Sequence, residues 1–473
     1  MVSYTVERII ESAALHPDRI AYKVNDEAIT YSQLVSEAKK TADYLMRQGT
    51  SPVVIMGHKS VDVVILIIAC LFAGRAYVPV EDTMPAERVK KIIEAVSAEL
   101  VVSEKKYGFK YCRSLKGLSE FADLPVKEQN NKFAYIIFTS GSTGEPKGVP
   151  ISYDNLDNFS RWISELYPLN EYENVAVLNH ASYSFDLSVA DFYYSMCNSH
   201  TLVALTNENK ADIGKSVEII KNEKISVAVM TPTSAKLYLL DRGFNSENLL
   251  SLSCIYFCGE VLEARTAEKL LLAFPGLKII NAYGPTEATS AVSATLIDNK
   301  TVENNTALPV GDADSFATEI EIIDDEIVLK GKSVFGGYIG FDSDRCFKSD
   351  GVNCYRTGDC GYIKDGRLYC CGRKDRQVKY MGYRMELDDI ESNINRIDGV
   401  ENCAVVAKIN SDSSVKKITA YVTVNESTID EAYIRNRLGE KIPQYMIPKT
   451  IKIVEELPVN QNGKTDRKAL SLL

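Results

Sequence analysis

A run rich in glycine, serine and threonine at residues 139–148 reads Thr-Ser-Gly-Ser-Thr-Gly-Glu-Pro-Lys-Gly and follows a β-type segment at 134–138. Glycines let backbone amides approach an anion closely, hydroxyls add donors, and a lysine supplies positive charge. The run therefore predicts a loop that binds a polyphosphate. A flexible surface turn is the plainer alternative for such a composition.

This run does not match the P-loop of nucleotide triphosphatases. In that motif a glycine precedes the lysine and a serine or threonine follows it, whereas Pro146 and Gly148 occupy those places here. The hydroxyl that usually binds magnesium is therefore missing.

A second polar segment, 281–287, follows a β-type segment at 278–280. It places the ring of Tyr283, the hydroxyl of Thr286 and the carboxylate of Glu287 in one tight turn. Such a turn could stack on a base, touch phosphate and hold magnesium through oxygen. Taken alone, Glu287 could equally be an acid that complements a helix N-terminus.

Three later segments carry further polar groups. The segment 355–359 ends in Asp359, an acid suited to the two hydroxyls of a ribose, and a short charged segment follows at 372–375. Near the end, 460–464 places Lys464 on an Asn-Gly turn. Taken alone, Asp359 would be a turn residue and Lys464 an exposed surface lysine.

The elements that must position these groups alternate between β-rich and helical segments up to about residue 340. Such pairs are 53–57 with 61–73, 175–179 with 187–196, and 227–230 with 235–240. This α/β alternation favours parallel sheets covered by helices. From 320 to 369, short β segments broken by acidic turns and glycines predict a small antiparallel barrel or meander.

A second domain is expected after the charged segment, where a new apolar pattern begins. We expect a hinge at Asp375, a large core domain over residues 1–374 that binds the nucleotide and substrate, and a small mobile α+β domain over 376–473 that carries Lys464. The helices predicted for the small domain are 386–396 and 429–438, and the strands are 404–407, 418–424 and 451–454.

Length, charge and hydrophobic pattern exclude several classes of protein. A chain of 473 residues exceeds the size at which one core keeps growing, so two or more domains are expected. Its net charge of -10 argues against a nucleic-acid partner. The first 23 residues predict an amphipathic helix rather than a signal peptide, and the apolar run 63–74 is far shorter than the roughly 20 residues that span a bilayer. We expect a cytoplasmic protein with no membrane insertion.

Metal-site patterns are weak. The eleven cysteines include no Cys-x-x-Cys pair, and the four histidines lack the spacing of metal ligands. Cys254 and Cys258 flank a β-type segment, where cysteine behaves as a small hydrophobic residue. His180 is interpreted as a packing residue rather than a base.

Taken in order, the polar segments resemble those of the adenylate-forming enzymes, the superfamily of acyl-CoA synthetases, luciferases and the adenylation domains of nonribosomal peptide synthesis. The resemblance extends from 29–34 to Lys464. Three segments, 184–188, 257–262 and 283–289, are most similar to stand-alone D-alanine:carrier-protein ligases. The resemblance implies an ATP- and magnesium-dependent ligase that activates an amino acid.

The resemblance also implies roles for individual residues. Tyr283 would stack on adenine, Asp359 would bind the ribose hydroxyls and Glu287 would carry magnesium. Lys464 would bridge the substrate carboxylate and the α-phosphate, where negative charge gathers in the transition state. The catalytic set would be Lys464, Glu287 and Thr286. The nucleotide-binding set would be Thr139, Ser140, Gly141, Ser142, Thr143, Gly144, Lys147, Gly259, Glu260, Asn281, Ala282, Tyr283, Gly284, Asp359 and Arg373.

A second step is implied by the same resemblance. The small domain would rotate about Asp375, withdraw Lys464 and present the loop around Gly382 to the phosphopantetheine thiol of a carrier protein. Because the sequence ends nine residues after Lys464, we expect that carrier to be a separate chain.

The resemblance also implies a substrate pocket. In it, Asp186 would bind the α-ammonium group of the amino acid. A helix N-cap onto 187–190 is the structural alternative for this aspartate. The other pocket residues would be Leu187, Ala190, Val229, Tyr256, Cys258, Ala282, Ser290 and Ala291. This neutral lining disfavours a charged side chain.

The expected size of that pocket bears on whether D-alanine is the substrate. Leu187 and Cys258 match the D-alanine ligases, but Ala190, Ala282 and Ser290 stand where bulkier Met, Thr and Val are usual. A wider pocket favours a larger neutral amino acid over D-alanine. The identity and chirality of the amino acid stay open.

Two rival functions remain. A carboxylate:coenzyme A ligase is disfavoured by Asp186, and a non-catalytic ATP-binding scaffold is disfavoured by the presence of Lys464, Glu287 and Asp359 together.

Overall fold

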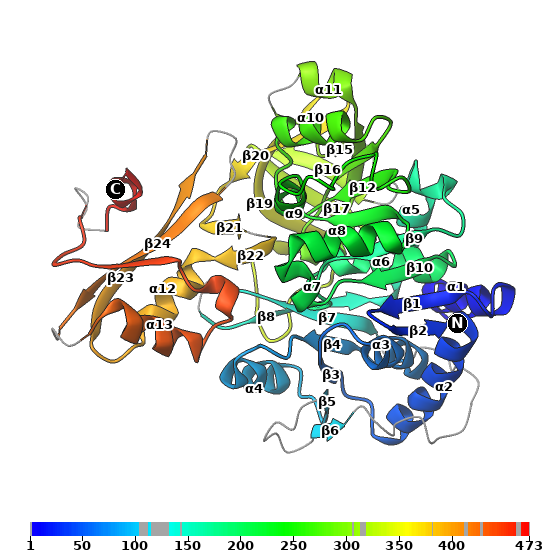
Figure 1. Ribbon diagram of the computed structural model, residues 1–473. Coiled ribbons are helices and arrows are strands. Elements are labelled where there is room, and N and C mark those ends of the chain that lie inside the picture. The colour runs from blue at the N-terminus through cyan, green and yellow to red at the C-terminus, as the bar shows by residue number, and fades with distance from the viewer. Residues whose placement is uncertain are drawn as a thin grey trace.

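A computed structural model describes residues 2–103, 112–114, 132–141, 144–304, 307–312, 318–380, 382–410, 415–425, 429–459 and 465–472. Figure 1 shows a large body, and to one side of it the orange and red elements of the C-terminal part.

The first sheet of the large body is mostly parallel. Its strands are β1 (Ile20–Val24), β2 (Glu27–Thr30), β9 (Ala176–Asn179), β10 (Thr201–Ala204), β11 (Ile225–Met230), β12 (Cys254–Phe257), β13 (Lys278–Tyr283) and β14 (Ser293–Ile297). Their order is β14-β13-β12-β11-β9-β10-β1-β2, and only the edge strands β14 and β2 run antiparallel to their neighbours. The carboxyl ends of β9, β11, β12 and β13 therefore meet at one edge, where α/β folds bind ligands.

A second sheet carries the glycine-rich loop. Its strands are β3 (Val53–Met56), β4 (Tyr77–Val80), β5 (Leu100–Ser103), β6 (Cys112–Ser114), β7 (Phe133–Thr139) and β8 (Lys147–Ser152), in the order β6-β5-β3-β4-β7-β8. Strand β8 is antiparallel to β7, and Thr139 pairs with Lys147 in their register. The glycine-rich loop thus joins the last two strands of this sheet.

Helices separate and cover the two sheets. They are α1 (Tyr4–Leu15), α2 (Tyr31–Arg47), α3 (Val61–Ala73), α4 (Ala86–Ala95), α5 (Tyr153–Glu165), η1 (Leu169–Glu171), α6 (Leu187–Cys197), α7 (Asn207–Ala211), α8 (Ile213–Asn222), α9 (Pro232–Tyr238), α10 (Ala264–Ala273), η2 (Thr286–Ala288) and α11 (Asn299–Asn304). The largest core cluster joins α2, α3, α5 and α6 to strands of both sheets, so these helices form the layer between them. Capping boxes at Thr30, Ser152 and Thr206 fix where α2, α5 and α7 begin.

A smaller antiparallel sheet follows, as the glycine- and turn-rich pattern predicts. Its strands are β15 (Gly311–Asp312), β16 (Thr318–Ile323), β17 (Glu326–Gly331), β18 (Cys346–Ser349), β19 (Val352–Lys364) and β20 (Arg367–Arg373). The order is β15-β20-β19-β17-β16, with β18 paired to β19. Asp359 lies directly opposite Arg373 in the β19–β20 register, so this sheet sets two of the predicted site residues side by side.

The C-terminal part is a compact α+β unit. Its elements are β21 (Gln377–Tyr380), β22 (Tyr383–Glu386), α12 (Leu387–Asn395), β23 (Val400–Ile409), β24 (Val415–Val424), α13 (Glu431–Gly439), η3 (Gln444–Met446), β25 (Thr450–Ile453) and α14 (Arg467–Leu472). A separate hydrophobic cluster between Val378 and Ile451 forms its core. We use the term small domain for residues 376–473. The division at Asp375 and its role as a hinge remain predictions.

The predicted N-terminal helix is wrong in its second half. Helix α1 ends at Leu15, and residues 20–24 form strand β1. Pro17 interrupts the helical pattern, and residues 22–24 pair in parallel with β10. None of the helices in the described part of the chain is long and apolar enough to cross a bilayer.

Candidate active site

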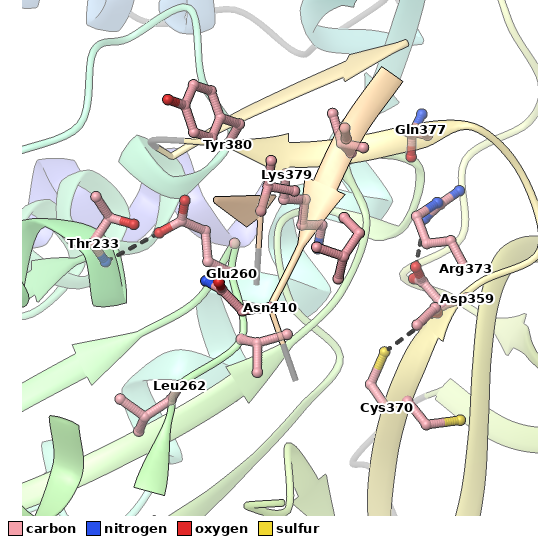
Figure 2. Close-up of a pocket in the computed structure, with 18 of the residues that line it drawn as sticks. Thr233, Glu260, Leu262, Asp359, Cys370, Arg373, Gln377, Lys379, Tyr380 and Asn410 are labelled. Carbon is pink, nitrogen blue, oxygen red and sulfur yellow. Dashed lines mark hydrogen bonds and ion pairs between the residues drawn. The ribbon is translucent and has the colours of Figure 1, made fainter. Parts of the chain in front are cut away.

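A cleft of about 950 Å³ lies where the large body meets the small domain. Figure 2 shows it between the loop after β12, strands β19 and β20, and the small domain's strand β21. The predicted site residues that line it are Cys258, Gly259, Glu260, Asn281, Ala282, Tyr283, Gly284, Asp359, Arg373 and Asp375. The fold therefore gathers these residues from distant parts of the sequence.

Tyr283, Asp359 and Arg373 form one end of this cleft, which we name the ribose corner. The Tyr283 hydroxyl donates to Asp359 Oδ2 at 2.7 Å. An Arg373 guanidinium nitrogen lies 2.5 Å from Asp359 Oδ1, and Figure 2 shows these two side chains facing each other. Burial lowers the pKa of Arg373, but the hydrogen bond that Arg373 donates to Asp375 and the charge of Asp359 together raise this pKa above its ordinary value. All three side chains are thus held in place before any ligand binds.

The predicted hinge residue is tied to the ribose corner. Asp375 accepts from Arg373 Nε at 2.7 Å and lies 2.8 Å from a guanidinium nitrogen of Arg345. Burial raises the pKa of Asp375, but its hydrogen bonds and the charges of the two arginines outweigh that effect and lower it to about 2. The carboxylate is therefore ionised at neutral pH.

Two other predicted nucleotide residues are fixed by packing. The Asn281 side-chain amide donates to the Pro309 carbonyl at 2.7 Å, so its amide hydrogen already has a structural partner. Gly284 has no room for a side chain, because a Cβ there would lie 2.5 Å from Ala291 Cα. These residues shape the cleft wall through their backbones.

None of the described residues of the glycine-rich loop lines the cleft. The Gly144 amide donates to the Gly141 carbonyl at 3.0 Å, which closes a turn, and Gly144 adopts a φ of 81°. Lys147 lies 4.4 Å from the centre of the Phe341 ring, and burial lowers the pKa of its ammonium group. Ser142 and Thr143 lie outside the described residues.

Glu287 is fully buried on η2, and its two oxygens have different partners. Tyr338 donates its hydroxyl to Oε1 at 2.6 Å, and Arg384 forms an ion pair with Oε2. Burial raises the pKa of Glu287, but the charge of Arg384 and both hydrogen bonds lower it to about 2. Because Arg384 belongs to β22, the cation at the predicted metal ligand comes from the small domain.

Further contacts place the small domain over this end of the site, which we name the phosphate corner (Ser140, Glu287 and the glycine-rich loop). The Glu386 amide donates to Ser140 Oγ at 2.9 Å. The Gly382 amide donates to Glu260 Oε1 at 2.7 Å. Glu260 Oε2 accepts from the Thr233 amide at 3.1 Å (Figure 2). The loop around Gly382 therefore lies against the nucleotide cleft.

Asp186 occupies the residue before α6, but its side chain makes no capping hydrogen bond. It is partly exposed and receives a hydrogen bond from Thr286. Burial raises the pKa of Asp186, and the Thr286 bond and the Arg384 charge only partly oppose this. The structure therefore does not support the helix-cap alternative and leaves the carboxylate for another partner.

The predicted pocket residues other than Asp186 and Ser290 share one buried cluster. They are Leu187, Ala190, Val229, Tyr256, Cys258, Ala282 and Ala291. Ser290 adjoins them, because the Cys258 thiol donates to the Ser290 carbonyl at 3.7 Å. The hydroxyls of Tyr256 and Ser290 are buried without a hydrogen-bond partner. The pocket is thus neutral but not wholly apolar.

Some site residues were not found from the sequence. Arg384 and Tyr338, which hold Glu287, carried no motif of their own, although Arg384 lies two residues after the predicted Gly382 loop. His180 packs edge-on against Tyr238, as a packing residue would. Lys464 and the rest of 460–464 lie outside the described residues.

Comparison with known proteins identifies relatives over the whole chain. Residues 9–339 match the family model of AMP-binding enzymes, and 389–464 match that of the AMP-binding enzyme C-terminal domain. A D-alanine–D-alanyl carrier protein ligase of Listeria monocytogenes is 36% identical, with 100% of this chain and 99% of the relative covered. A Bacillus licheniformis protein of the same name is 34% identical, with 98% of each covered.

Solved structures share the fold. The Vibrio cholerae adenylation domain AlmE, in complex with glycyl-adenosine-5'-phosphate, superposes with a TM-score of 0.87 at 24% identity, over 100% of this chain and 98% of that one. Holo-PA1221, a protein with adenylation and PCP domains, gives 0.83 at 24% identity, over 98% of this chain and 83% of that one.

Proposed function

This chain belongs to the AMP-binding enzyme family, and on that premise we propose that it activates a neutral amino acid as an aminoacyl-AMP and transfers it to the phosphopantetheine thiol of a separate carrier protein. The names of its relatives, the ribose corner and the carboxylate of Asp186, which caps no helix, support this proposal.

The first step joins the amino acid to AMP. A carboxylate oxygen of the amino acid forms a bond to the α-phosphorus of ATP, and the bond from that phosphorus to the bridging oxygen breaks, so that pyrophosphate leaves. No proton moves, because the carboxylate is already a nucleophile at neutral pH, and alignment and charge neutralisation do the work. Asp359 binds the ribose hydroxyls, Tyr283 contacts the base, and Lys464 neutralises the reacting phosphate.

The residues at the phosphate corner fit magnesium. In the described part of the chain, no three His, Cys, Asp or Glu side chains are grouped to hold a metal ion. Mg²⁺ commonly uses one or two carboxylates together with substrate phosphates, and Glu287 supplies one ionised carboxylate. Magnesium at Glu287 would neutralise the charge on the β- and γ-phosphates, which Thr139, Ser140 and Lys147 would hold in position.

The second step moves the aminoacyl group. The thiol sulfur forms a bond to the carbonyl carbon, the bond from that carbon to the phosphate oxygen breaks, and AMP leaves with the electron pair while the thiol proton passes to water. The loop around Gly382 lies where such an arm would approach the cleft, since the Gly382 amide bonds Glu260.

The observation that carries the choice of an amino acid is the carboxylate of Asp186. It caps no helix, its pKa is raised by burial, and it lies beside Thr286 at the phosphate corner. An α-ammonium group would supply the positive charge that this desolvated carboxylate lacks. A carboxylic acid without an amino group would leave it unpaired.

Pyrophosphate exchange into ATP tests this function. Proteinogenic L-amino acids, D-alanine and simple carboxylic acids are compared, with Lys464→Ala as the control. A response to one or a few neutral amino acids is expected. A D-alanine response would agree with the named relatives, and a larger amino acid would agree with the wider pocket. Exchange driven only by a plain carboxylic acid, followed by transfer to coenzyme A, would reject the proposal in favour of a coenzyme A ligase.

A further inference from the structure

Two buried hydroxyls in the expected amino-acid pocket have no partner in the protein. Tyr256 is fully buried and Ser290 is 2% exposed, and neither side-chain oxygen has a hydrogen-bond partner. Most buried polar groups in folded proteins are paired, because a buried hydroxyl without a partner is destabilising. Phenylalanine and alanine would occupy nearly the same space without that cost. The two hydroxyls are therefore candidates for contacts with a bound ligand.

Strand β12 directs the side chain of Tyr256 toward helix α6. Successive residues of a strand face opposite sides of the sheet. Tyr256 belongs to the core cluster that contains α6, whereas its neighbours Ile255 and Phe257 belong to the cluster on the other face. Helix α6 begins directly after Asp186. Tyr256 therefore lies on the same side of the sheet as the helix that the expected ammonium-binding residue precedes.

The carboxylate of Asp186 acts on the polar groups of this pocket. Burial raises the pKa of Tyr256, and Cys258 and Asp186 raise it further. Burial also raises the pKa of the Cys258 thiol to about 11, with Lys379 opposing this shift and Asp186 adding to it. Both groups thus lie within the electrostatic reach of Asp186, and both keep their protons at neutral pH.

Ser290 is fixed beside Cys258 by its backbone. Its carbonyl accepts from the Cys258 thiol at 3.7 Å, and its φ is 72°. A residue other than glycine rarely adopts this left-handed conformation and keeps it only where the surrounding structure holds it. A Cβ at Gly284 would lie 2.9 Å from the Ser290 carbonyl, so the two backbones are closely packed. The Ser290 hydroxyl takes no part in these contacts.

The other pocket residues nearby are small. Ala190, Ala282 and Ala291 belong to the same buried cluster as Tyr256. Their side chains carry no polar atom that could pair with a hydroxyl. A ligand that reaches Tyr256 and Ser290 would supply the hydrogen bonds that the protein lacks.

We propose that Tyr256 and Ser290 select an amino acid whose side chain is neutral and carries a hydroxyl or a carboxamide. This inference deepens the proposed function, on which it rests for the placement of an amino acid at Asp186. Tyrosine and serine hydroxyls both donate and accept hydrogen bonds, and so do hydroxyl and carboxamide side chains. The charge of Asp186 disfavours a carboxylate side chain, and an ammonium side chain would find no second carboxylate among the predicted pocket residues.

Discrimination against an apolar side chain of the same shape should be strong. A polar side chain would pair with the two hydroxyls, whereas its apolar counterpart would leave both unpaired in the complex. Sites built to hydrogen-bond a substrate group reject analogues that lack the group far more strongly than they reject a change of one methylene. We expect kcat/KM for the preferred amino acid to exceed that of its apolar counterpart by at least about 100-fold.

Pairs of amino acids with nearly the same shape test this preference. Pyrophosphate exchange into ATP is compared for threonine against valine, serine against 2-aminobutyrate, and asparagine against leucine, each as both enantiomers, with D-alanine added. The first two pairs report on a hydroxyl, and the third reports on a carboxamide. Calorimetry with the corresponding aminoacyl sulfamoyladenosines, which are unreactive mimics of aminoacyl-AMP, gives a second readout that needs no turnover.

Matched variants assign the preference to the two hydroxyls. Tyr256→Phe and Ser290→Ala should each lower the ratio of polar to apolar kcat/KM by roughly tenfold, as expected for one hydrogen bond. Tyr22→Phe and Ser12→Ala are the controls, because they remove hydroxyls of β1 and α1 that are also buried and unpartnered. These controls should leave the ratio unchanged. The ratio compares two substrates on one protein, so a partial loss of folded enzyme cancels.

Several results would overturn the inference. Equal use of the apolar counterpart, or D-alanine as the best substrate, would reject it and leave the proposed function intact. A polar preference that survives in both Tyr256→Phe and Ser290→Ala, or that falls equally in the two control variants, would reject the role of these hydroxyls. Preferential binding of a polar sulfamoyladenosine without pyrophosphate exchange would support the inference and reject the proposed function alone. Neither binding nor exchange with any amino acid would reject both.

Discussion

The ribose corner and the phosphate corner bind parts of the same expected nucleotide but are built differently. Tyr283, Asp359 and Arg373 all belong to the large body and bond one another. At the phosphate corner, by contrast, Ser140 and Glu287 bond groups of the small domain. The first corner is therefore complete in any position of the small domain, whereas the second changes its partners when that domain moves.

This difference suggests a division of labour. When side chains are already ordered, little binding free energy is lost in ordering them. The ribose corner can therefore hold the adenosine part through both half-reactions. At the phosphate corner, the contacts with the small domain would depend on whether the triphosphate is still bound. The predicted hinge residue, Asp375, bonds Arg373 of the ribose corner. Variants that affect the two corners separately test this view.

The largest effect is expected for Lys464→Ala, which removes the cation that the family resemblance assigns to the transition state. Adenylation should fall by about 10²- to 10³-fold, the usual loss when one charge-stabilising group is deleted. Transfer from a chemically prepared aminoacyl-AMP to the carrier thiol should be nearly unchanged, because that step does not use Lys464. Single-turnover assays of both half-reactions measure this. An equal loss in both would contradict the division between them.

Asp186→Asn should have the next largest effect, confined to the amino acid. Removing one partner of a buried charge pair costs roughly 2–5 kcal/mol, so kcat/KM for the amino acid should fall at least about thirtyfold. KM for ATP should change little, because Asp186 is expected to contact the amino acid rather than ATP and the ribose corner stays intact. Steady-state pyrophosphate exchange at varied concentrations of each substrate separates the two. A matching rise in both KM values would indicate a structural role.

Asp359→Asn should weaken the ribose corner itself. Hydrogen bonds to a charged group contribute about 1.5–3 kcal/mol, so ATP and AMP should each bind roughly 10- to 100-fold more weakly. The dependence on Mg²⁺ should not change, since the metal belongs to the other corner. Arg373 keeps Asp375 as a partner, so the fold should survive. Calorimetry with both nucleotides measures the loss of affinity. Weaker binding of ATP alone would contradict the assignment of Asp359 to the ribose, which ATP and AMP share.

Local sequence signals predicted much of the fold. The apolar run 61–73 forms α3 over those same residues, because Ser60 caps it and Gly74 ends it in a left-handed conformation. The predicted strand after residue 400 is longer than expected, because exposed polar residues of β23 pair with β24 beyond the apolar segment. Hydrophobic pattern alone could not show that extension.

Sequence motifs pointed to residues that the structure brings together, but not to the partner of each residue. Asp359, Arg373 and Tyr283 were chosen from separate motifs, and the structure brings them within hydrogen-bond distance. The partner of Glu287 could not be derived, since nothing local in 382–386 indicates that Arg384 reaches a carboxylate about a hundred residues earlier. That contact depends on how the C-terminal part of the chain packs on the large body, which neither periodicity nor turn chemistry encodes.

The smallest effect is expected for Tyr338→Phe. This variant separates the contribution of the large body to the phosphate corner from that of the small domain. Tyr338 donates to Glu287 at 2.6 Å from the large body, so it should stabilise the carboxylate whether Arg384 or magnesium is the cation. Its loss should lower the free energy of unfolding by about 1.5 kcal/mol, the lower end of the range for a hydrogen bond to a charged group. The ratio of Gly382 exchange with and without magnesium nucleotide should not change, because both states lose the same bond. Denaturant unfolding and hydrogen exchange measure the two effects. If Tyr338→Phe instead makes the Gly382 amide exchange faster in both states, then contact with the small domain depends on the orientation of Glu287 rather than on the charge of its ion pair with Arg384, and the contrast between the two corners would rest on geometry instead of charge.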